Sequence, residues 1–152
     1  MIKSKTAKIL ILTGIFPPDI GGPATQLDSL IKQLIKQGYQ VRVLTFGQKD
    51  HKYPYQVNRV SHKWPLFFEN LIYLIKGLIL SFKTDIIYNQ DLYTSGITSL
   101  IIKKVLKKKL VTRFVEDPTF ETGSFSKIRK SILFNSDKII VVSNYIKEIV
   151  LK

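Results

Sequence analysis

The chain has 152 residues, a length that suits a single domain. Hydrophobic residues make up 45% of it, which is enough to build a core, and the lack of cysteine excludes disulfides and cysteine-ligated metals. The formal net charge of +13 favours an anionic partner: a nucleic acid, an anionic membrane surface or a phosphorylated substrate. The two histidines, His51 and His62, do not have the spacing of metal ligands, so we expect no metal site.

Short apolar runs alternate with helical patterns along the chain. The run at 8–13 is almost continuously apolar, which is typical of a strand buried on both faces. Residues 26–37 have helical spacing and end at Gly38, and 41–45 is the second predicted strand. Further strands are predicted at 56–61 (the weakest), 85–88, 110–115 and 137–142. Further helices are predicted at 66–82, 94–106 with Thr94 or Ser95 as cap, 125–134, and 143–152 with Ser143 as cap.

This alternation predicts one doubly wound α/β domain over residues 1–152. We expect a mostly parallel, Rossmann-like sheet of about six strands, in the order 3-2-1-4-5-6, with helices on both faces. Ligands of such sheets bind at the carboxyl ends of the strands, near the point where the strand order reverses.

The loop after the first strand lies at that place and contains Pro17-Pro18 and Gly21-Gly22. The two glycines let backbone approach a ligand without an intervening Cβ, and the next helix begins with unpaired N–H groups that suit a phosphate. Thr25 can donate its hydroxyl to the same ligand. The loop is neither a dinucleotide fingerprint nor a P-loop, so ordinary loop chemistry remains an alternative reading.

The stretch "FPPDIGGPATQLDSLIKQLIKQGYQVRVLT" resembles the start of retaining glycosyltransferases of family 4, which have the GT-B architecture. The family's Pro-Pro-x-x-Gly-Gly loop, and the Gly-His/Tyr-x-Val segment after its helix, are matched at Pro17, Pro18, Gly21, Gly22, Gly38, Tyr39 and Val41. The segments "DIIYNQD" and "SDKIIVVSNYIKEIV" are similar to later segments of the same family, so the resemblance covers essentially the whole chain.

The resemblance implies the N-terminal, acceptor-side domain of a two-domain enzyme. The C-terminal domain of such enzymes holds most of the nucleotide-sugar, usually with a Glu-x7-Glu motif that this sequence does not reproduce. We therefore expect a truncated, degenerate or split hexosyltransferase, inactive alone, that needs a separate or missing C-terminal half. Its co-substrate would be a nucleotide-sugar, with no cofactor and no metal, and its pathway cell-envelope polysaccharide biosynthesis.

Three sets of residues follow from the resemblance. Gly21, Gly22 and Thr25 would form a donor-phosphate loop. Asp117 and Glu121 fall on the acidic positions of the family's Gly-Asp-x-x-x-Glu segment and would be catalytic, although Glu116 replaces the glycine and capping is an alternative role. Asn89, Asp91 and Ser143 would bind the acceptor, with turn formation as the alternative for Asn89 and Asp91.

Family acceptors are often lipid-linked. The segment 99–110 has five lysines among aliphatic residues, and the apolar segment 66–82 is too short and interrupted to span a bilayer. We expect a cytoplasmic protein with peripheral contact at the inner face of the membrane, through Trp64, Leu66, Phe67 and Phe68, or else ordinary sheet-covering helices with solvated lysines.

Two other function classes remain open. The first is a free-standing Rossmann-like module that binds a ligand without catalysis. The second is a nucleic-acid binder, which only the charge suggests, since the sequence has no recognition motif and no clustered aromatic platform.

Overall fold

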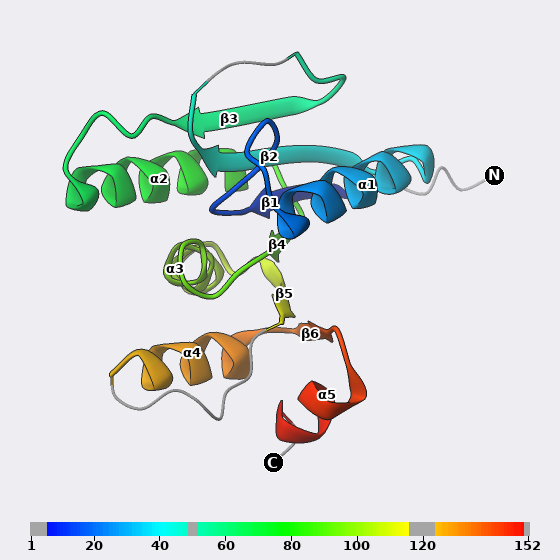
Figure 1. The fold of residues 1–152 in the computed structure, drawn as a ribbon, viewed down its shortest axis with the longest axis vertical. Helices are drawn as coiled ribbons and strands as arrows, with labels where there is room; N and C mark the ends of the chain where they lie inside the picture. The colour runs from blue at the N-terminus through cyan, green and yellow to red at the C-terminus, as the bar shows by residue number, and fades with distance from the viewer. Residues whose placement is uncertain (1–5, 49–51, 116–123, 151–152) are drawn as a thin grey trace.

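The computed structural model describes residues 6–48, 52–115 and 124–150. They form one parallel sheet in the order β3-β2-β1-β4-β5-β6, as the sequence predicts (Figure 1). The strands are β1 (Lys8–Leu12), β2 (Gln40–Phe46), β3 (Gln56–Val60), β4 (Ile86–Asn89), β5 (Lys109–Phe114) and β6 (Lys138–Val141). The helices are α1 (Gly22–Lys36), α2 (Leu66–Ser81), α3 (Gly96–Leu106), α4 (Ser124–Asn135) and α5 (Asn144–Val150).

The strand order reverses between β1 and β4. Strand β1 pairs with β2 on one side and with β4 on the other, and Leu12 lies level with Leu44 and Asn89. The loops that follow β1 and β4 therefore start side by side at the carboxyl edge of the sheet. A doubly wound sheet opens a crevice for ligands at this point.

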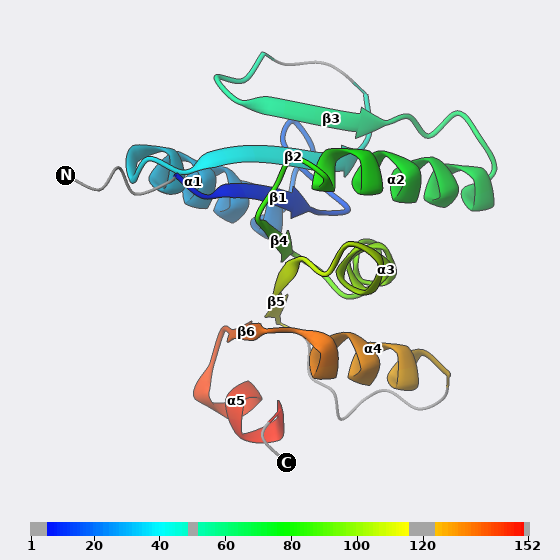
Figure 2. The ribbon, with the colours of Figure 1, turned by 180° about the vertical axis from the view of Figure 1, so that it is seen from behind.

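Helices cover both faces of the sheet, with α1 and α5 on one side and α2, α3 and α4 on the other (Figures 1 and 2). Alternate residues of the buried strands face opposite layers: Leu10 and Leu12 pack in the cluster under α2 and α3, whereas Ile9 and Ile11 pack in the cluster under α1. Both faces of β1 are thus buried, which explains its unbroken apolar sequence.

Most element boundaries agree with the sequence prediction to within two residues, and the start of α1 is the exception. The helix begins at Gly22, four residues before the predicted Gln26. Pro23 occupies the first helical turn, where the absence of its N–H costs nothing and its fixed φ suits a helix. The glycine pair therefore belongs partly to the helix, and the ligand-facing loop is shorter than the sequence suggests.

Among the described residues, none of the helices combines the length and the apolar character needed to cross a bilayer.

Candidate functional site

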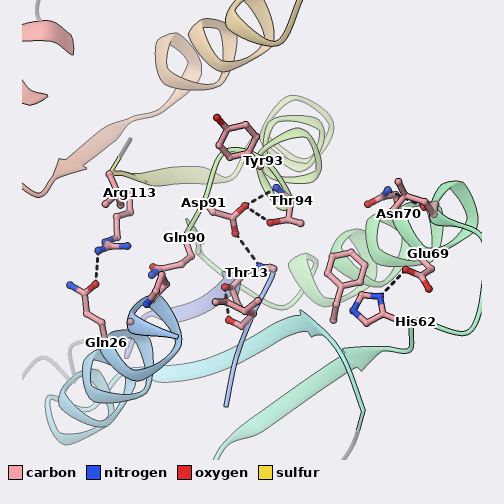
Figure 3. Close-up of a pocket in the computed structure, with 17 residues that line it drawn as sticks. Thr13, Gln26, His62, Glu69, Asn70, Gln90, Asp91, Tyr93, Thr94 and Arg113 are labelled. Carbon is pink, nitrogen blue, oxygen red and sulfur yellow. Dashed lines mark hydrogen bonds and ion pairs between the residues drawn. The ribbon is translucent and has the colours of Figure 1, made fainter. Parts of the chain in front are cut away.

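A cavity of about 880 Å³ opens at the carboxyl edge of the sheet (Figure 3). Its walls come from the ends of five strands and from the first turns of α1 and α2. The lining residues are Thr13, Gly14, Ile15, Gly22, Pro23, Gln26, Phe46, His62, Leu66, Glu69, Asn70, Gln90, Asp91, Tyr93, Thr94, Arg113 and Val115. The cavity thus lies where the strand order predicts a ligand.

The start of α1 forms one end of the cavity. No side chain caps this helix, and its first turn contains no acidic residue, so the positive end of its dipole is not neutralised locally. A Cβ added at Gly22 would meet no atom within 4 Å, which means that the glycine leaves open space there. The geometry suits an anion.

Arg113, at the end of β5, lies beside the same helix. Its Nη2 donates to Oε1 of Gln26 on α1, and the residue is only 9% exposed. None of the described carboxylates forms an ion pair with this guanidinium. A buried guanidinium without a counterion is costly unless an anion binds beside it.

Hydrogen bonds hold the loop between β1 and α1 against β3. The carbonyl oxygen of Pro17 accepts hydrogen bonds from the hydroxyl of Tyr53 and from Nη2 of Arg59. Arg59 also donates from Nη1 to the carbonyl of Phe46, at 3.1 Å, and Phe16 is fully buried. The loop is therefore fixed by neighbours far away in the sequence and not only by its own prolines.

Asp91 occupies the centre of the site, and both of its carboxylate oxygens accept hydrogen bonds. Oδ2 accepts from the backbone N–H of Gly14 at 3.0 Å, and Oδ1 accepts from those of Thr94 and Ser95 at 2.7 and 3.2 Å. The carboxylate thus joins the β1 loop to the start of α3. It holds the turn before α3, although no side chain caps the helix itself, and Ser95 at the N-cap position donates its hydroxyl to Asn89 Oδ1.

Tyr73 and Phe46 form an aromatic layer beside the cavity. Their rings stack with centroids 4.5 Å apart, and Tyr73 Oη donates to the carbonyls of Thr13 and Leu44, each at 3.1 Å. Burial, with a contribution from the charge of Asp91, raises the pKa of Tyr73 well above its usual value. The hydroxyl therefore stays protonated and fixes the end of β1.

His62 and Glu69 form the opposite end of the cavity from Arg113 (Figure 3). His62 follows β3, and its Nδ1 lies 2.9 Å from Oε2 of Glu69, a buried residue in the first turn of α2. The imidazole also stacks on Phe46, with centroids 5.5 Å apart. The ring is therefore held in place although its side chain is 64% exposed.

The structure brings some of the predicted site residues together and separates others. Gly22 and Asp91 line the cavity, whereas Gly21, Thr25, Asn89 and Ser143 are not among its lining residues. Thr25 Oγ1 donates to the carbonyl of Gly21, and Ser143 Oγ accepts from the N–H of Ile146 as the predicted cap of α5. Asp117 and Glu121 lie outside the described residues.

Glu69 and Arg113, polar residues at the two ends of the cavity, carry no distinct signal in the sequence. Glu69 resembles an ordinary acidic residue in a first helical turn, and Arg113 a charged residue at the end of a strand. The positions were predictable in principle, because His62 directly follows a predicted parallel strand and Arg113 lies near the carboxyl end of another. In the described part of the chain, no group of three or more acidic, histidine or cysteine side chains is placed to hold a metal ion.

The model of the family described as Glycosyltransferase Family 4 matches residues 20–152. The chain belongs to this family. The match includes α1 and extends through every later element, and it confirms the resemblance to this family; Pro17 and Pro18 lie before the matched residues. No curated protein is similar enough to this family member to match it.

Solved structures with the same fold include nucleotide-sugar enzymes. UDP-GlcNAc 2-epimerase from Methanocaldococcus jannaschii superposes with a TM-score of 0.73 at 15% identity, over 95% of this chain and 42% of that one. HepE from Anabaena, in complex with UDP and glucose, gives 0.65 at 16% identity, over 88% and 37%. An α-glucosyltransferase in complex with UDP and a 13-mer DNA gives 0.57 at 14% identity, over 90% and 38%. The family 4 chain thus spans about two fifths of the length of these proteins, and at such identities the likeness shows the fold.

Proposed function

We propose that this chain is the N-terminal lobe of a retaining sugar transferase that uses a nucleotide-sugar donor. The observation that carries the proposal is the cavity at the reversal point of the sheet, with an uncapped helix start and a buried arginine at one end. Membership of Glycosyltransferase Family 4 supports the reaction class. Two of the proteins with similar structures were solved with UDP, which supports a uridine nucleotide as the donor.

The proposed role of the Gly22 end is to contact the donor phosphates. The N–H groups of the first α1 turn and the guanidinium of Arg113 would stabilise the negative charge that grows on the departing diphosphate. Of the loop residues predicted from the sequence, Gly22 is the one that lines the cavity, so the proposal now centres on it. Gly21 and Thr25 would act through the helix start, since Thr25 bonds back to Gly21.

The proposed role of the remaining lining is to hold the acceptor. Gln90 is buried and lines the cavity, and among the described residues its Oε1 has no hydrogen-bond partner, so a ligand hydroxyl would satisfy it. Asp91 and Asn89 serve the site chiefly through the turn that they stabilise. The catalytic role of Asp117 and Glu121 and the acceptor role of Ser143 rest on the family resemblance alone.

The proposal includes a C-terminal partner lobe that encloses the donor. The cavity is open, and the proteins of similar structure are more than twice as long as this chain. We expect the lobe with the Glu-x7-Glu motif to come from a further part of the same protein or from a separate subunit. The chain alone would then transfer no sugar.

The proposal also includes contact with a lipid-linked acceptor at the inner face of the cytoplasmic membrane. Four apolar residues at the start of α2 are strongly exposed: Trp64 at 61%, Leu66 at 75%, Phe67 at 73% and Phe68 at 52%. They lie next to the cavity, since Leu66 also lines it. Exposed aromatic residues beside lysines favour an interface with anionic lipid.

Titration calorimetry with UDP tests the donor end. The variant Arg113→Gln removes the buried guanidinium and its charge-assisted hydrogen bonds, and is expected to weaken UDP binding about 10- to 100-fold. Gly22→Trp fills the cavity and should abolish binding, whereas Gly22→Ala should bind UDP as the wild type does, because the added Cβ meets no atom. Gln33→Trp, on the exposed face of α1, controls for added bulk.

UDP binding that is unchanged in both Arg113→Gln and Gly22→Trp would refute the donor role of this cavity. Sugar transfer from UDP-glucose by the chain alone would refute the need for a second lobe. Transfer that appears only on mixing with a Glu-x7-Glu lobe would support it. UDP binding without transfer in any such mixture would favour the free-standing binding module instead.

Vesicle sedimentation tests the membrane contact. The double variant Phe67→Ser, Phe68→Ser should lose most of its binding to phosphatidylglycerol vesicles, since it removes two exposed apolar side chains. Phe82→Ser at the other end of α2, where the ring is 68% exposed, is the matched control and should bind normally. Equal loss in both variants, or no binding by the wild type, would refute contact through this cluster.

A further inference from the structure

The paired side chains of His62 and Glu69 have no role in the donor end of the cavity. Glu69 belongs to the first turn of α2, yet its side chain is only 6% exposed. One of its oxygens lies 2.9 Å from His62 Nδ1, and the other accepts from the backbone N–H of Trp64 at 3.4 Å. Contacts to both oxygens thus hold the carboxylate in place, and the carboxylate in turn holds the imidazole of His62.

The orientation of the His62 ring is set by two independent contacts. Its plane lies at 13° to that of Phe46, so stacking restrains the tilt of the ring, and the bond from Nδ1 to Glu69 restrains its rotation. Phe46 is itself buried and stacked on Tyr73 at 9°. An exposed histidine that only solvated the surface would not need this support from the core.

The chemistry of the pair decides which group His62 can bind. A carboxylate only accepts hydrogen bonds, so in the neutral imidazole the hydrogen lies on Nδ1, and Nε2 carries the free lone pair. Within the described part of the chain, no residue hydrogen-bonds to Nε2. His62 lines the cavity, so a hydrogen-bond acceptor of fixed direction is available there to a ligand.

We propose that Nε2 of His62 accepts a hydrogen bond from a hydroxyl group of the acceptor sugar, with Glu69 as the positioning residue. This inference rests on the proposed sugar transferase function and names the place of the acceptor within it. The subsite lies across the cavity from Gln26 and Arg113, which leaves room for donor and acceptor to meet over Asp91 (Figure 3).

The surroundings of His62 favour a pyranose over an anionic ligand. The buried negative charge of Glu69 opposes a phosphate or carboxylate at this end, whereas the basic groups of the cavity lie at the other. Phe46 and the exposed Leu66 supply apolar surface next to the imidazole, and sugar rings have apolar faces. Asn70 adds an amide on the same wall, although its Nδ2 donates to the carbonyl of Leu66.

Nitrogen-15 NMR of the imidazoles provides the test, because the chain has only two histidines. Spectra at about pH 8, where an ordinary imidazole is neutral, should show His62 with its hydrogen on Nδ1. His62→Gln assigns the signal by removing it. Titration with methyl α-glucoside, methyl α-mannoside and methyl α-galactoside should then move the Nε2 resonance of His62 with at least one of the three sugars and leave that of His51 in place.

The variants separate a bound hydroxyl from a merely structural histidine. His62→Ala should weaken binding of the same glycoside about 2- to 10-fold, the usual effect of losing one hydrogen bond, and His62→Gln should weaken it less because its amide oxygen can accept. Glu69→Gln should increase the proportion of imidazole with its hydrogen on Nε2 and should weaken binding of the glycoside. Lys63→Ala changes an exposed neighbour of His62 and should leave both the tautomer of His62 and the glycoside affinity unchanged.

The inference is overturned if none of the glycosides moves the His62 resonance of the wild type, or if His62→Ala binds them as tightly as the wild type does. UDP binding reports on the proposed function separately, since it depends on Gly22 and Arg113. Loss of UDP binding in Arg113→Gln without any effect of glycosides on His62 would leave the transferase function standing and remove only this subsite.

Discussion

Replacing Asp91 with alanine should destabilise the fold strongly, although the residue lies in the middle of the candidate site. The variant removes the acceptor of the long-range hydrogen bond from Gly14, which is worth about 1.5–3 kcal/mol for a charged partner. It also removes the acceptor for the N–H groups of Thr94 and Ser95 in the turn before α3, a loss of about 1 kcal/mol. We therefore expect a loss of about 3 kcal/mol in the free energy of unfolding.

Urea unfolding followed by circular dichroism measures this loss. With a slope of about 2 kcal/mol per molar urea, typical of a small domain, the midpoint of Asp91→Ala should fall by about 1.5 M. Asp91→Asn keeps one acceptor oxygen, so its urea midpoint should fall by less. Glu148→Ala removes an exposed acid from α5 and should shift the midpoint by no more than about 0.3 M.

A small shift for Asp91→Ala, equal to that of Glu148→Ala, would refute this reasoning. It would mean that the three backbone donors find other partners and that the carboxylate is free to bind the acceptor, which is the role the family resemblance implies for Asp91. The same measurement therefore decides between the structural and the acceptor-binding interpretation of this residue.

Two further stability predictions use the same assay. Gly14→Ala would place its Cβ 2.3 Å from Thr94 Oγ1, a group that is hydrogen-bonded to Asp91, and should lower the free energy of unfolding by about 1–3 kcal/mol. Gly22→Ala, where the added Cβ meets no atom, should leave it unchanged. Equal urea midpoints for the two variants would refute the predicted crowding at Gly14. The hydrogen bonds from Lys103 and from the N–H of Leu110 lower the pKa of Asp137, so its contribution to stability is present near neutral pH and is lost as the pH falls below about 4. The midpoint difference between the wild type and Asp137→Asn should shrink between pH 7 and pH 3, and a difference that is constant with pH would contradict the assignment.

The fold was largely predictable because its main signals are local. Strand β1 is apolar on both faces, and α1 repeats its apolar residues at helical spacing, so each could be recognised without knowledge of its neighbours. The start of α1 was predicted too late, since two glycines and a proline suggest a loop when they are read by composition. Pro23 is in fact compatible with the first turn of a helix, and the extended φ of Gly21 is open to any residue.

The candidate site was predictable in place but not in detail. The strand order alone put the ligand at the carboxyl edge between β1 and β4, and Gly22 and Asp91 do line the cavity there. The pairing of His62 with Glu69 depends on how α2 packs against the end of β3. The hydrogen bond from Arg113 to Gln26 joins side chains 87 positions apart. Such contacts follow from tertiary packing, which no periodicity in one sequence encodes.

The division of labour within the cavity follows from how a parallel sheet is built. The loops after β1 and β4 meet at the reversal point, and their N–H groups need acceptors. The carboxylate of Asp91 lies between the loops, and the hydrogen bonds that it accepts from these groups occupy it. The groups left for ligands then include Gln90 next to Asp91, Arg113 at one end and His62 at the other (Figure 3). Variants at the centre should therefore alter the free energy of unfolding, and variants at the ends should alter ligand affinity with little effect on the fold.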